Sequence, residues 1–232
     1  MGKANTSFSL NGALVESAAP PHARLSAVLR EDLDAKDVKV GCNAGDCGAC
    51  TVLIDGAPVC ACLTPLAQAQ GRSVQTLRGI APDILGKLQA SFTAHQAAQC
   101  GICTPAMIVS AAALLEATPK PSPEQVQDAL GGVLCRCTGY RKIIDAVVAV
   151  GAELPKTNAK GAVGDPIARL DGAAKVDGSE RFGDDVAPDG ALTALVIRAP
   201  FAHAAFELGD LDTLRSSEGI KAVLTAADIP GI

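Results

Sequence analysis

Nine cysteines, all between Cys42 and Cys137, are the residues of this 232-residue chain best suited to chemistry. A first group has Cys42-x4-Cys47-x2-Cys50 followed by Cys60 and Cys62, and a second group has Cys100-x2-Cys103 and Cys135-x-Cys137. The opening residues, MGKANTSFSLNG, show neither a basic cluster before an apolar stretch nor a twin-arginine signal, so we expect a cytoplasmic protein. Because disulfides are rare in that reducing compartment, we expect the thiols to bind metal.

The first group has the Cys-x4-Cys-x2-Cys…Cys spacing of plant-type [2Fe–2S] ferredoxins. Its loop contains Gly41, Gly45 and Gly48, and glycine lets the backbone adopt positive φ and bring N–H groups close to the sulfurs. Zinc is the alternative, but it normally takes paired knuckles rather than three ligands from one loop. Cys60 and Cys62 are two residues apart on an expected strand and face the same side, so spacing alone leaves either as the fourth ligand.

The second group favours another diiron cluster, again with zinc as the alternative. Both cysteine pairs are expected at helix N-termini, where the dipole and the free N–H groups favour negative charge. A Cys-x-Cys pair fits poorly around one tetrahedral zinc ion, but it can hold one iron of a diiron cluster.

The elements that must position the first group are short strands. Asn11-Gly12 and Asp55-Gly56 predict two hairpins, the first after Ser7–Leu10 and the second between Thr51–Ile54 and Pro58-Val59. Leu25, Val28 and Leu29 predict one short helix between the hairpins, and Val74–Leu77 predicts a last strand. One helix among several strands indicates a compact α+β domain.

Residues 82–152 instead show helical spacing. Four helices are expected: one through Ile84 and Phe92, one opened by Thr104-Pro105, one capped by Ser122 with Gln125 at the third position, and one capped by Thr138. Helices of this length form a small bundle.

The chain from Glu153 to Asp165 is polar and rich in Lys, Gly and Pro, which predicts a linker. Residues 166–232 alternate short apolar runs with turns and predict a partial α/β segment, in which Ala191–Arg198 is the clearest strand.

Composition argues against two classes of partner. The net charge is −5, no block of Lys or Arg occurs, and aromatic residues make up 3% with no Trp, so nucleic acid and anionic membranes lack their usual attraction. The longest apolar run, Ala106–Leu115, is too short to cross a bilayer.

Four motifs closely resemble the iron–sulfur part of the xanthine oxidase family, the molybdenum hydroxylases that include xanthine dehydrogenases, aldehyde oxidoreductases and aerobic carbon monoxide dehydrogenases. They are GCNAGDCGACTVLIDG (residues 41–56), Cys62-Leu63, QCGICTP (residues 99–105) and CRCTGY (residues 135–140). The resemblance covers residues 6–150. It implies a plant-type ferredoxin (β-grasp) domain at 1–79 followed by a four-helix-bundle [2Fe–2S] domain at 80–152.

The resemblance also implies the role of each cysteine. Cys42, Cys47, Cys50 and Cys62 would bind an outer cluster, which leaves Cys60 as a small buried residue, and Cys100, Cys103, Cys135 and Cys137 would bind an inner one beside the molybdenum cofactor. Gln99 and Cys137 match positions that touch the pterin of that cofactor, although spacing alone would make Gln99 an ordinary helix-end amide.

Residues 166–232 resemble, more loosely, the opening of the family's molybdopterin-binding subunit, joined through the linker at 153–165. The matching stretches are residues 164–172, 175–178, 198–204 and 223–231. Phe201 stands where a His is often found, so we assign no chemistry to His203. Some single-chain aldehyde oxidoreductases fuse these two parts in the same order.

The resemblance therefore implies an electron-transfer component of a molybdenum-dependent hydroxylase that acts on an aldehyde or an N-heterocycle. A large molybdenum-binding subunit would hold most of the molybdenum cofactor, and a flavin or cytochrome subunit would accept the electrons. The isolated chain is expected to be inactive, because no His/Glu/Asp constellation or phosphate-binding glycine loop is present. A free-standing ferredoxin-like electron carrier is the alternative, and the segment after Asp165 speaks against it.

Overall fold

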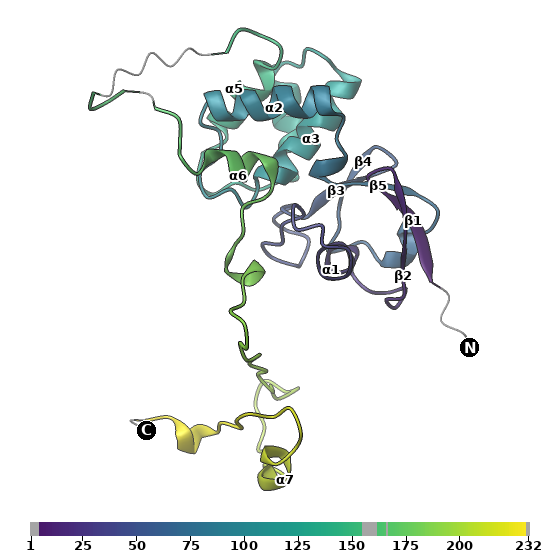
Figure 1. Ribbon diagram of the computed structural model, residues 1–232, viewed down its shortest axis with the longest axis vertical. Helices are drawn as coiled ribbons and strands as arrows, with labels where there is room; N and C mark the ends of the chain where they lie inside the picture. The colour runs from purple at the N-terminus through teal and green to yellow at the C-terminus, as the bar shows by residue number, and fades with distance from the viewer. Residues whose placement is uncertain (1–4, 155–161, 166, 231–232) are drawn as a thin grey trace. The chain divides into compact units, whose positions relative to one another are not determined.

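The structure is a computed structural model that describes residues 5–154, 162–165 and 167–230 (Figure 1). The chain divides into two compact units, Met1–Asp185 and Val186–Ile232. Of the predicted linker at 153–165, residues 155–161 lie outside the described residues.

The first half of the larger unit, residues 5–79, is built on a five-stranded sheet with the order β2-β1-β5-β3-β4. The central pairing of β1 with β5 is parallel, and the other pairings are antiparallel. We call this part the ferredoxin half. Its strands are β1 (Thr6–Leu10), β2 (Ala13–Ser17), β3 (Thr51–Ile54), β4 (Ala57–Cys60) and β5 (Ser73–Gln75).

Both predicted hairpins are confirmed. Asn11 and Gly12 have φ values of 52° and 86°, and Asp55 and Gly56 have values of 49° and 81°. Two successive residues with positive φ form the turn whose twist matches that of the flanking strands. The last strand, predicted over Val74–Leu77, ends two residues earlier than expected, because β5 ends at Gln75 and Leu77 starts a 3₁₀ turn (Leu77–Gly79).

The predicted short helix of the ferredoxin half is confirmed as α1 (Leu25–Ala27), which continues as one wider turn over Val28–Asp32. Its apolar side chains pack against the sheet, and Phe8, Leu25, Leu29, Val52 and Leu66 are fully buried in the shared core.

The helical half, residues 80–152, contains the four predicted helices α2 (Pro82–Ala94), α3 (Thr104–Ala117), α4 (Pro123–Leu130) and α5 (Arg141–Val148). Ser122 and Gln125 form the predicted reciprocal cap at the start of α4. Helix α3 is buried on nearly every side because α2, α4 and β3 all contact it, which explains its almost uniformly apolar sequence.

The prediction that Thr138 caps the last helix is wrong. The chain passes through Gly139 and Tyr140 with φ values of 64° and 66°, and α5 begins only at Arg141. The Thr138 hydroxyl accepts a hydrogen bond from the Tyr140 N–H, 3.1 Å away, and lies 3.1 Å from the sulfur of Cys135. The Thr138 side chain therefore forms hydrogen bonds within the cysteine segment and does not cap α5.

The larger unit extends beyond the helical half. Helix α6 (Gly172–Asp177) packs against α2 and α3, and a 3₁₀ turn follows at Gly183–Asp185. Val176 of α6 is 6% exposed and belongs to the core of the helical half.

The second unit contains α7 (Leu211–Arg215) and a 3₁₀ turn at Ala226–Asp228, and its described residues, 186–230, include no strand. The strand predicted over Ala191–Arg198 is therefore wrong in this structure. Leu195 and Ile197 are 84% and 85% exposed. A single extended segment needs a neighbouring strand to satisfy its backbone groups, and this unit supplies none in its described part.

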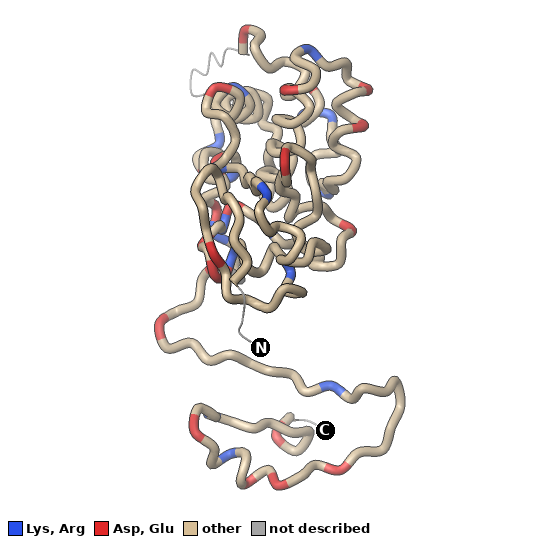
Figure 2. Tube along the Cα trace, turned by 90° about the vertical axis from the view of Figure 1, so that its right-hand side faces the viewer, with Lys and Arg blue, Asp and Glu red and all other residues tan. Residues whose placement is uncertain are grey.

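Acidic and basic residues are interspersed along the described trace, as Figure 2 shows. Among the residues described, none of the helices combines the length and the apolar character that crossing a bilayer requires.

Candidate iron–sulfur sites

The first cysteine group lies between α1 and the β3–β4 hairpin, in the loop before β3 and the turn after β4. Cys42 is exposed, Cys47 is partly buried, and Cys50 and Cys62 are buried. The N–H groups of Ala44 and Cys47 point at the sulfur of Cys42, at 3.3 and 3.4 Å. The N–H of Cys62 points at the sulfur of Cys50, also at 3.4 Å.

The sulfurs of this group approach one another in pairs. The Cys42 thiol is in hydrogen-bonding contact with the Cys47 thiol, and the Cys50 thiol is in contact with that of Cys62. Cys60 also reaches the sulfur of Cys50. Strand β4 ends at Cys60 and Cys62 lies in the following turn, so the prediction that both lie on one strand is wrong.

Ionisation differs sharply within the group. Hydrogen bonds from the Ala44 and Cys47 N–H groups lower the pKa of Cys42 to about 7. Burial raises the pKa of Cys50 to about 12 and also raises that of Cys60. A buried thiol of this kind loses its proton when a metal cation binds it.

Two of the loop glycines are required by the backbone. Gly45 has φ +87°, and a Cβ there would lie 2.3 Å from Cδ1 of Leu63. Gly48 has φ +66°, and a Cβ there would lie 2.0 Å from the carbonyl oxygen of Gly132. Glycine at 48 thus allows the first cysteine loop to touch the helical half directly.

The second group joins two segments of the helical half. Cys100 and Cys103 directly precede α3, as predicted, whereas Cys135 and Cys137 lie in the turns before α5. The thiols pair across the segments, because Cys100 contacts Cys137 and Cys103 contacts Cys135. Cys103 and Cys135 are buried, and Cys100 and Cys137 are exposed.

Burial and hydrogen bonds together set the pKa values of the thiols in the second group. Burial raises the pKa of Cys103. Burial acts in the same direction at Cys135, but hydrogen bonds from the Thr138 hydroxyl and N–H outweigh it and lower the pKa of that thiol. The Cys135 N–H donates to the Tyr140 hydroxyl at 2.8 Å. Sequence reasoning gave Thr138 and Tyr140 no role at the cysteines, although both stand in the CRCTGY motif.

Gln99 lies beside the exposed pair. Its side-chain amide donates to the carbonyl oxygen of Cys137 at 3.0 Å, and both residues are exposed. The two residues predicted to touch a pterin are therefore in contact with each other at the surface.

A backbone hydrogen bond links the two cysteine groups. The N–H of Leu134, which precedes Cys135, donates to the carbonyl oxygen of Cys47 at 2.9 Å. Gly48 lies against Gly132 at the same place. A residue of the first group is thus one hydrogen bond and one peptide unit from a residue of the second.

The donor set fits [2Fe–2S] clusters. The first group has five sulfurs, which include the contacting pairs Cys42–Cys47 and Cys50–Cys62, and the second group has four sulfurs in two contacting pairs. A [2Fe–2S] cluster takes two thiolates on each iron. Among the residues the structure describes, no three or more His, Cys, Asp or Glu side chains are arranged to hold a single metal ion.

Comparison with known families supports this chemistry. Residues 8–76 match the family described as a 2Fe-2S iron-sulfur cluster binding domain, and residues 76–148 match the family described as a [2Fe-2S] binding domain.

Relatives that are matched over nearly all of their own length identify the wider family. The chain is 44% identical over 149 residues to the nicotine 6-hydroxylase small subunit of Paenarthrobacter nicotinovorans, covering 64% of this chain and 90% of that protein. It is 45% identical over 150 residues to the nicotinate dehydrogenase small FeS subunit of Eubacterium barkeri, covering 63% and 94%. The chain belongs to the xanthine oxidase family.

Another member of that family matches across nearly the whole chain. The aldehyde oxidoreductase of Megalodesulfovibrio gigas is 37% identical over 227 residues, which cover 90% of this chain and 25% of that protein. The crystal structure of the aldehyde oxidoreductase from Desulfovibrio desulfuricans superposes with a TM-score of 0.74 at 41% identity, over 81% of this chain and 23% of that one. The chain thus spans about a quarter of these aldehyde oxidoreductases.

Proposed function

We propose that this chain is the electron-transferring iron–sulfur part of a molybdenum-dependent oxidoreductase. The observation that carries the proposal is the pair of cysteine quartets joined by the hydrogen bond from the Leu134 N–H to the Cys47 carbonyl. When bound, each [2Fe–2S] cluster would accept and release one electron. A free-standing ferredoxin is the weaker interpretation, because the relatives of this chain are small subunits and a larger oxidoreductase of which the match covers a quarter.

For the outer site we propose Cys42, Cys47, Cys50 and Cys62 as ligands. Cys62 is 3% exposed, and its own N–H points at the sulfur of Cys50. Cys60 pairs with Thr51 in the β3–β4 ladder, and we propose that it remains a free thiol. The N–H groups of Ala44 and Cys47 would stabilise the negative charge on the sulfur of Cys42.

For the inner site we propose Cys100, Cys103, Cys135 and Cys137. Because the thiols pair across the two segments, each iron would take one sulfur from the segment before α3 and one from the segment before α5. The Thr138 hydroxyl would hold negative charge on the sulfur of Cys135.

Gln99 and Cys137 are proposed to contact the pterin of the molybdenum cofactor. Their exposure leaves them accessible to a group held by another polypeptide or by a further domain, and the Gln99 amide fixes the backbone at Cys137. Electrons would then enter at the inner quartet and pass along the Cys135–Leu134–Cys47 contact to the outer quartet.

The partner is proposed to be a large molybdenum-binding polypeptide, with a flavin or cytochrome subunit as the electron acceptor. Relatives named for nicotine, nicotinate and aldehydes favour an N-heterocycle or an aldehyde as the substrate. We propose domain boundaries at 1–79, 80–152 and 153–165, with 166–232 as the opening of the molybdopterin-binding domain, and a cytoplasmic location.

The test is reduction by substrate. The complex purified from its native source is mixed with candidate aldehydes and N-heterocycles, and the visible absorption of the clusters is followed. Bleaching by substrate in the complex, and its absence in the isolated chain, is the expected result. Turnover of substrate by the isolated chain would contradict the proposal.

A further inference from the structure

Residues 169–185, here called the strap, include α6 and the residues that follow it (Figure 1), and they contact both the helical half and the ferredoxin half. Nothing in the motifs of the sequence assigns them a role in the iron–sulfur part. Helix α6 begins the strap against α2 and α3, and the residues after α6 continue along the ferredoxin half.

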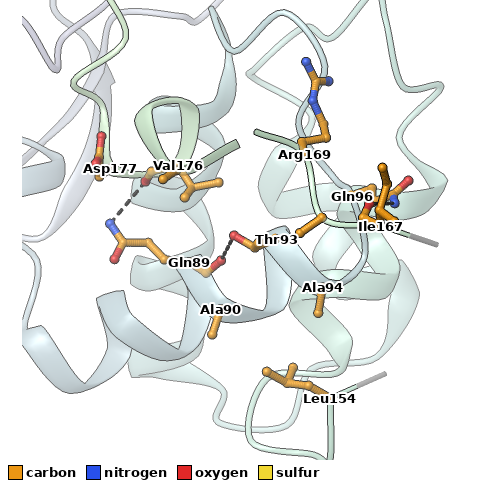
Figure 3. A pocket seen from close by; sticks show the side chains of 12 residues that line it. Gln89, Ala90, Thr93, Ala94, Gln96, Leu154, Ile167, Arg169, Val176 and Asp177 are labelled. Carbon is orange, nitrogen blue, oxygen red and sulfur yellow. Dashed lines mark hydrogen bonds between the residues drawn. The ribbon is translucent and has the colours of Figure 1, made fainter. Parts of the chain in front are cut away.

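The strap is attached to the helical half by backbone and core contacts. Gln89 of α2 donates its side-chain amide to the carbonyl of Val176 at 3.2 Å, as Figure 3 shows beside the pocket between α2 and the strap. Arg169 donates to the carbonyl of Ala98 at 3.1 Å. Val176 completes the apolar core of this half.

A buried lysine attaches the strap to the ferredoxin half. Lys39 is 1% exposed, and its ammonium group donates to the carbonyls of Gly178 and Glu180 at 3.1 and 2.6 Å. The same ammonium lies 5.5 Å from the centre of the Phe182 ring. Because a buried ammonium needs hydrogen-bond acceptors, and two of its acceptors are strap carbonyls, the two parts depend on each other.

Two further contacts close the same junction. The side chains of Arg30 and Asp185 form an ion pair and are 7% and 3% exposed. Gly178 has φ +78°, and a Cβ there would lie 2.8 Å from Cβ of Asp37 and 3.0 Å from Cδ2 of Leu77. The strap backbone therefore packs directly against the ferredoxin half.

The strap also covers the inner cysteine segment. Lys175 is 5% exposed, and its aliphatic stem lies so close to Gly101 that a Cβ there would be 2.8 Å from Cγ of the lysine. Its ammonium is neutralised within the strap by Asp171 and Glu180, at 3.0 and 3.2 Å.

We infer that the strap clamps the ferredoxin half to the helical half and so fixes the separation of the two cysteine quartets, with Lys39 as its main positioning residue. The inference deepens the proposed function, since a fixed separation matters for electron transfer, whose rate falls steeply with distance. The contacts that hold the strap involve none of the proposed ligands.

The test compares K39M with K36M in the full chain. Methionine keeps the length of the side chain and removes the ammonium, and Lys36 is a partly exposed lysine that pairs with Glu31. Amide hydrogen exchange at residues 176–182 should rise about tenfold or more in K39M and stay unchanged in K36M. In the reduced holoprotein, the magnetic splitting between the two cluster EPR signals should weaken in K39M alone.

A second pair of variants involves no charge. G178A and G190A both place alanine at positive φ, +78° and +76°, but Gly190 has open space around its Cβ position and Gly178 does not. Only G178A should raise the rate of amide hydrogen exchange in the strap and weaken the magnetic splitting between the two EPR signals. If K39M cannot be loaded with iron, this pair decides the outcome.

Unchanged amide hydrogen exchange at residues 176–182 in both K39M and G178A would overturn the inference that the strap clamps the two halves together. Faster exchange with an unaltered splitting would also overturn it, because the strap would then be a local cover that positions nothing. Absence of two iron–sulfur signals from the unsubstituted chain would instead contradict the proposed function, so the two failures are distinguishable.

Discussion

The two cysteine groups reach similar pairwise contacts by different means. In the first, three cysteines come from one loop whose path depends on Gly45 and Gly48. In the second, the segment before α3 and the turns before α5 present two cysteines each, and the Thr138 hydroxyl hydrogen-bonds to the sulfur of Cys135. The first group therefore depends on backbone conformation, and the second depends more on side-chain hydrogen bonds.

The largest expected effect separates Cys62 from Cys60. C62A should lose the outer cluster, so that iron content falls by about half and one of the two EPR signals disappears. C60A, the matched control two residues away at the end of β4, should retain both signals. Loss of the outer signal in C60A would reverse the ligand assignment.

The backbone dependence of the first group is tested by G48A. Alanine at φ +66° costs about 1–2 kcal/mol, and its Cβ would also lie 2.0 Å from the Gly132 carbonyl oxygen. We therefore expect the free energy of unfolding to fall by about 3 kcal/mol or more. G56A, with φ +81° and no atom within 4 Å, should cost only about 1–2 kcal/mol. Urea unfolding measures the free energy of unfolding of both variants. Equal losses in G48A and G56A would refute the contact between the ferredoxin half and the helical half.

The exposed thiols of the two groups should differ in their dependence on pH. In the metal-free chain the pKa of Cys42 is about 7, whereas contact with Cys100 raises that of Cys137 above its ordinary value. Thiolate forms as pH rises, so alkylation of Cys42 should level off above about pH 7 while that of Cys137 continues to increase. Peptide mass spectrometry at pH 7.5 should show Cys42 reacting about tenfold faster.

Similar alkylation rates for these two exposed thiols would show that the N–H groups of Ala44 and Cys47 do not stabilise the Cys42 thiolate.

The smallest expected effect concerns the hydrogen bond to the inner group. T138V removes the hydroxyl and keeps the shape of the side chain. Loss of about 1 kcal/mol of charge stabilisation corresponds to about 40 mV in a one-electron couple, so the inner cluster should become harder to reduce by that amount. Redox titration monitored by EPR should show an unchanged reduction potential for the outer cluster. An equal shift in the potentials of both clusters would contradict the assignment of Thr138 to the inner cluster.

Local signals in the sequence predicted most of the fold. Asn11-Gly12 and Asp55-Gly56 predicted the hairpins because positive φ at two successive residues is a local requirement. Ser122 and Gln125 predicted the start of α4 because the cap satisfies backbone groups within one turn. The cysteine spacing predicted the two groups of sulfurs that the structure brings together.

Contacts between distant residues could not be predicted in this way. Lys39 and Gly178 are 139 positions apart, and no local pattern connects them. Thr138 has the residue type of a helix cap, but the positive φ of Tyr140 delays the helix to Arg141. Ala191–Arg198 has the composition of a strand, yet strand formation depends on a neighbour that its own sequence cannot specify.

The most direct test of the central claim is metal and sulfide analysis, with EPR of the dithionite-reduced form, on the natively purified protein. The account predicts about four irons and about four acid-labile sulfides per chain, and two distinct [2Fe–2S] signals. Zinc in place of iron and sulfide, or a single iron–sulfur signal from fully loaded protein, would contradict it.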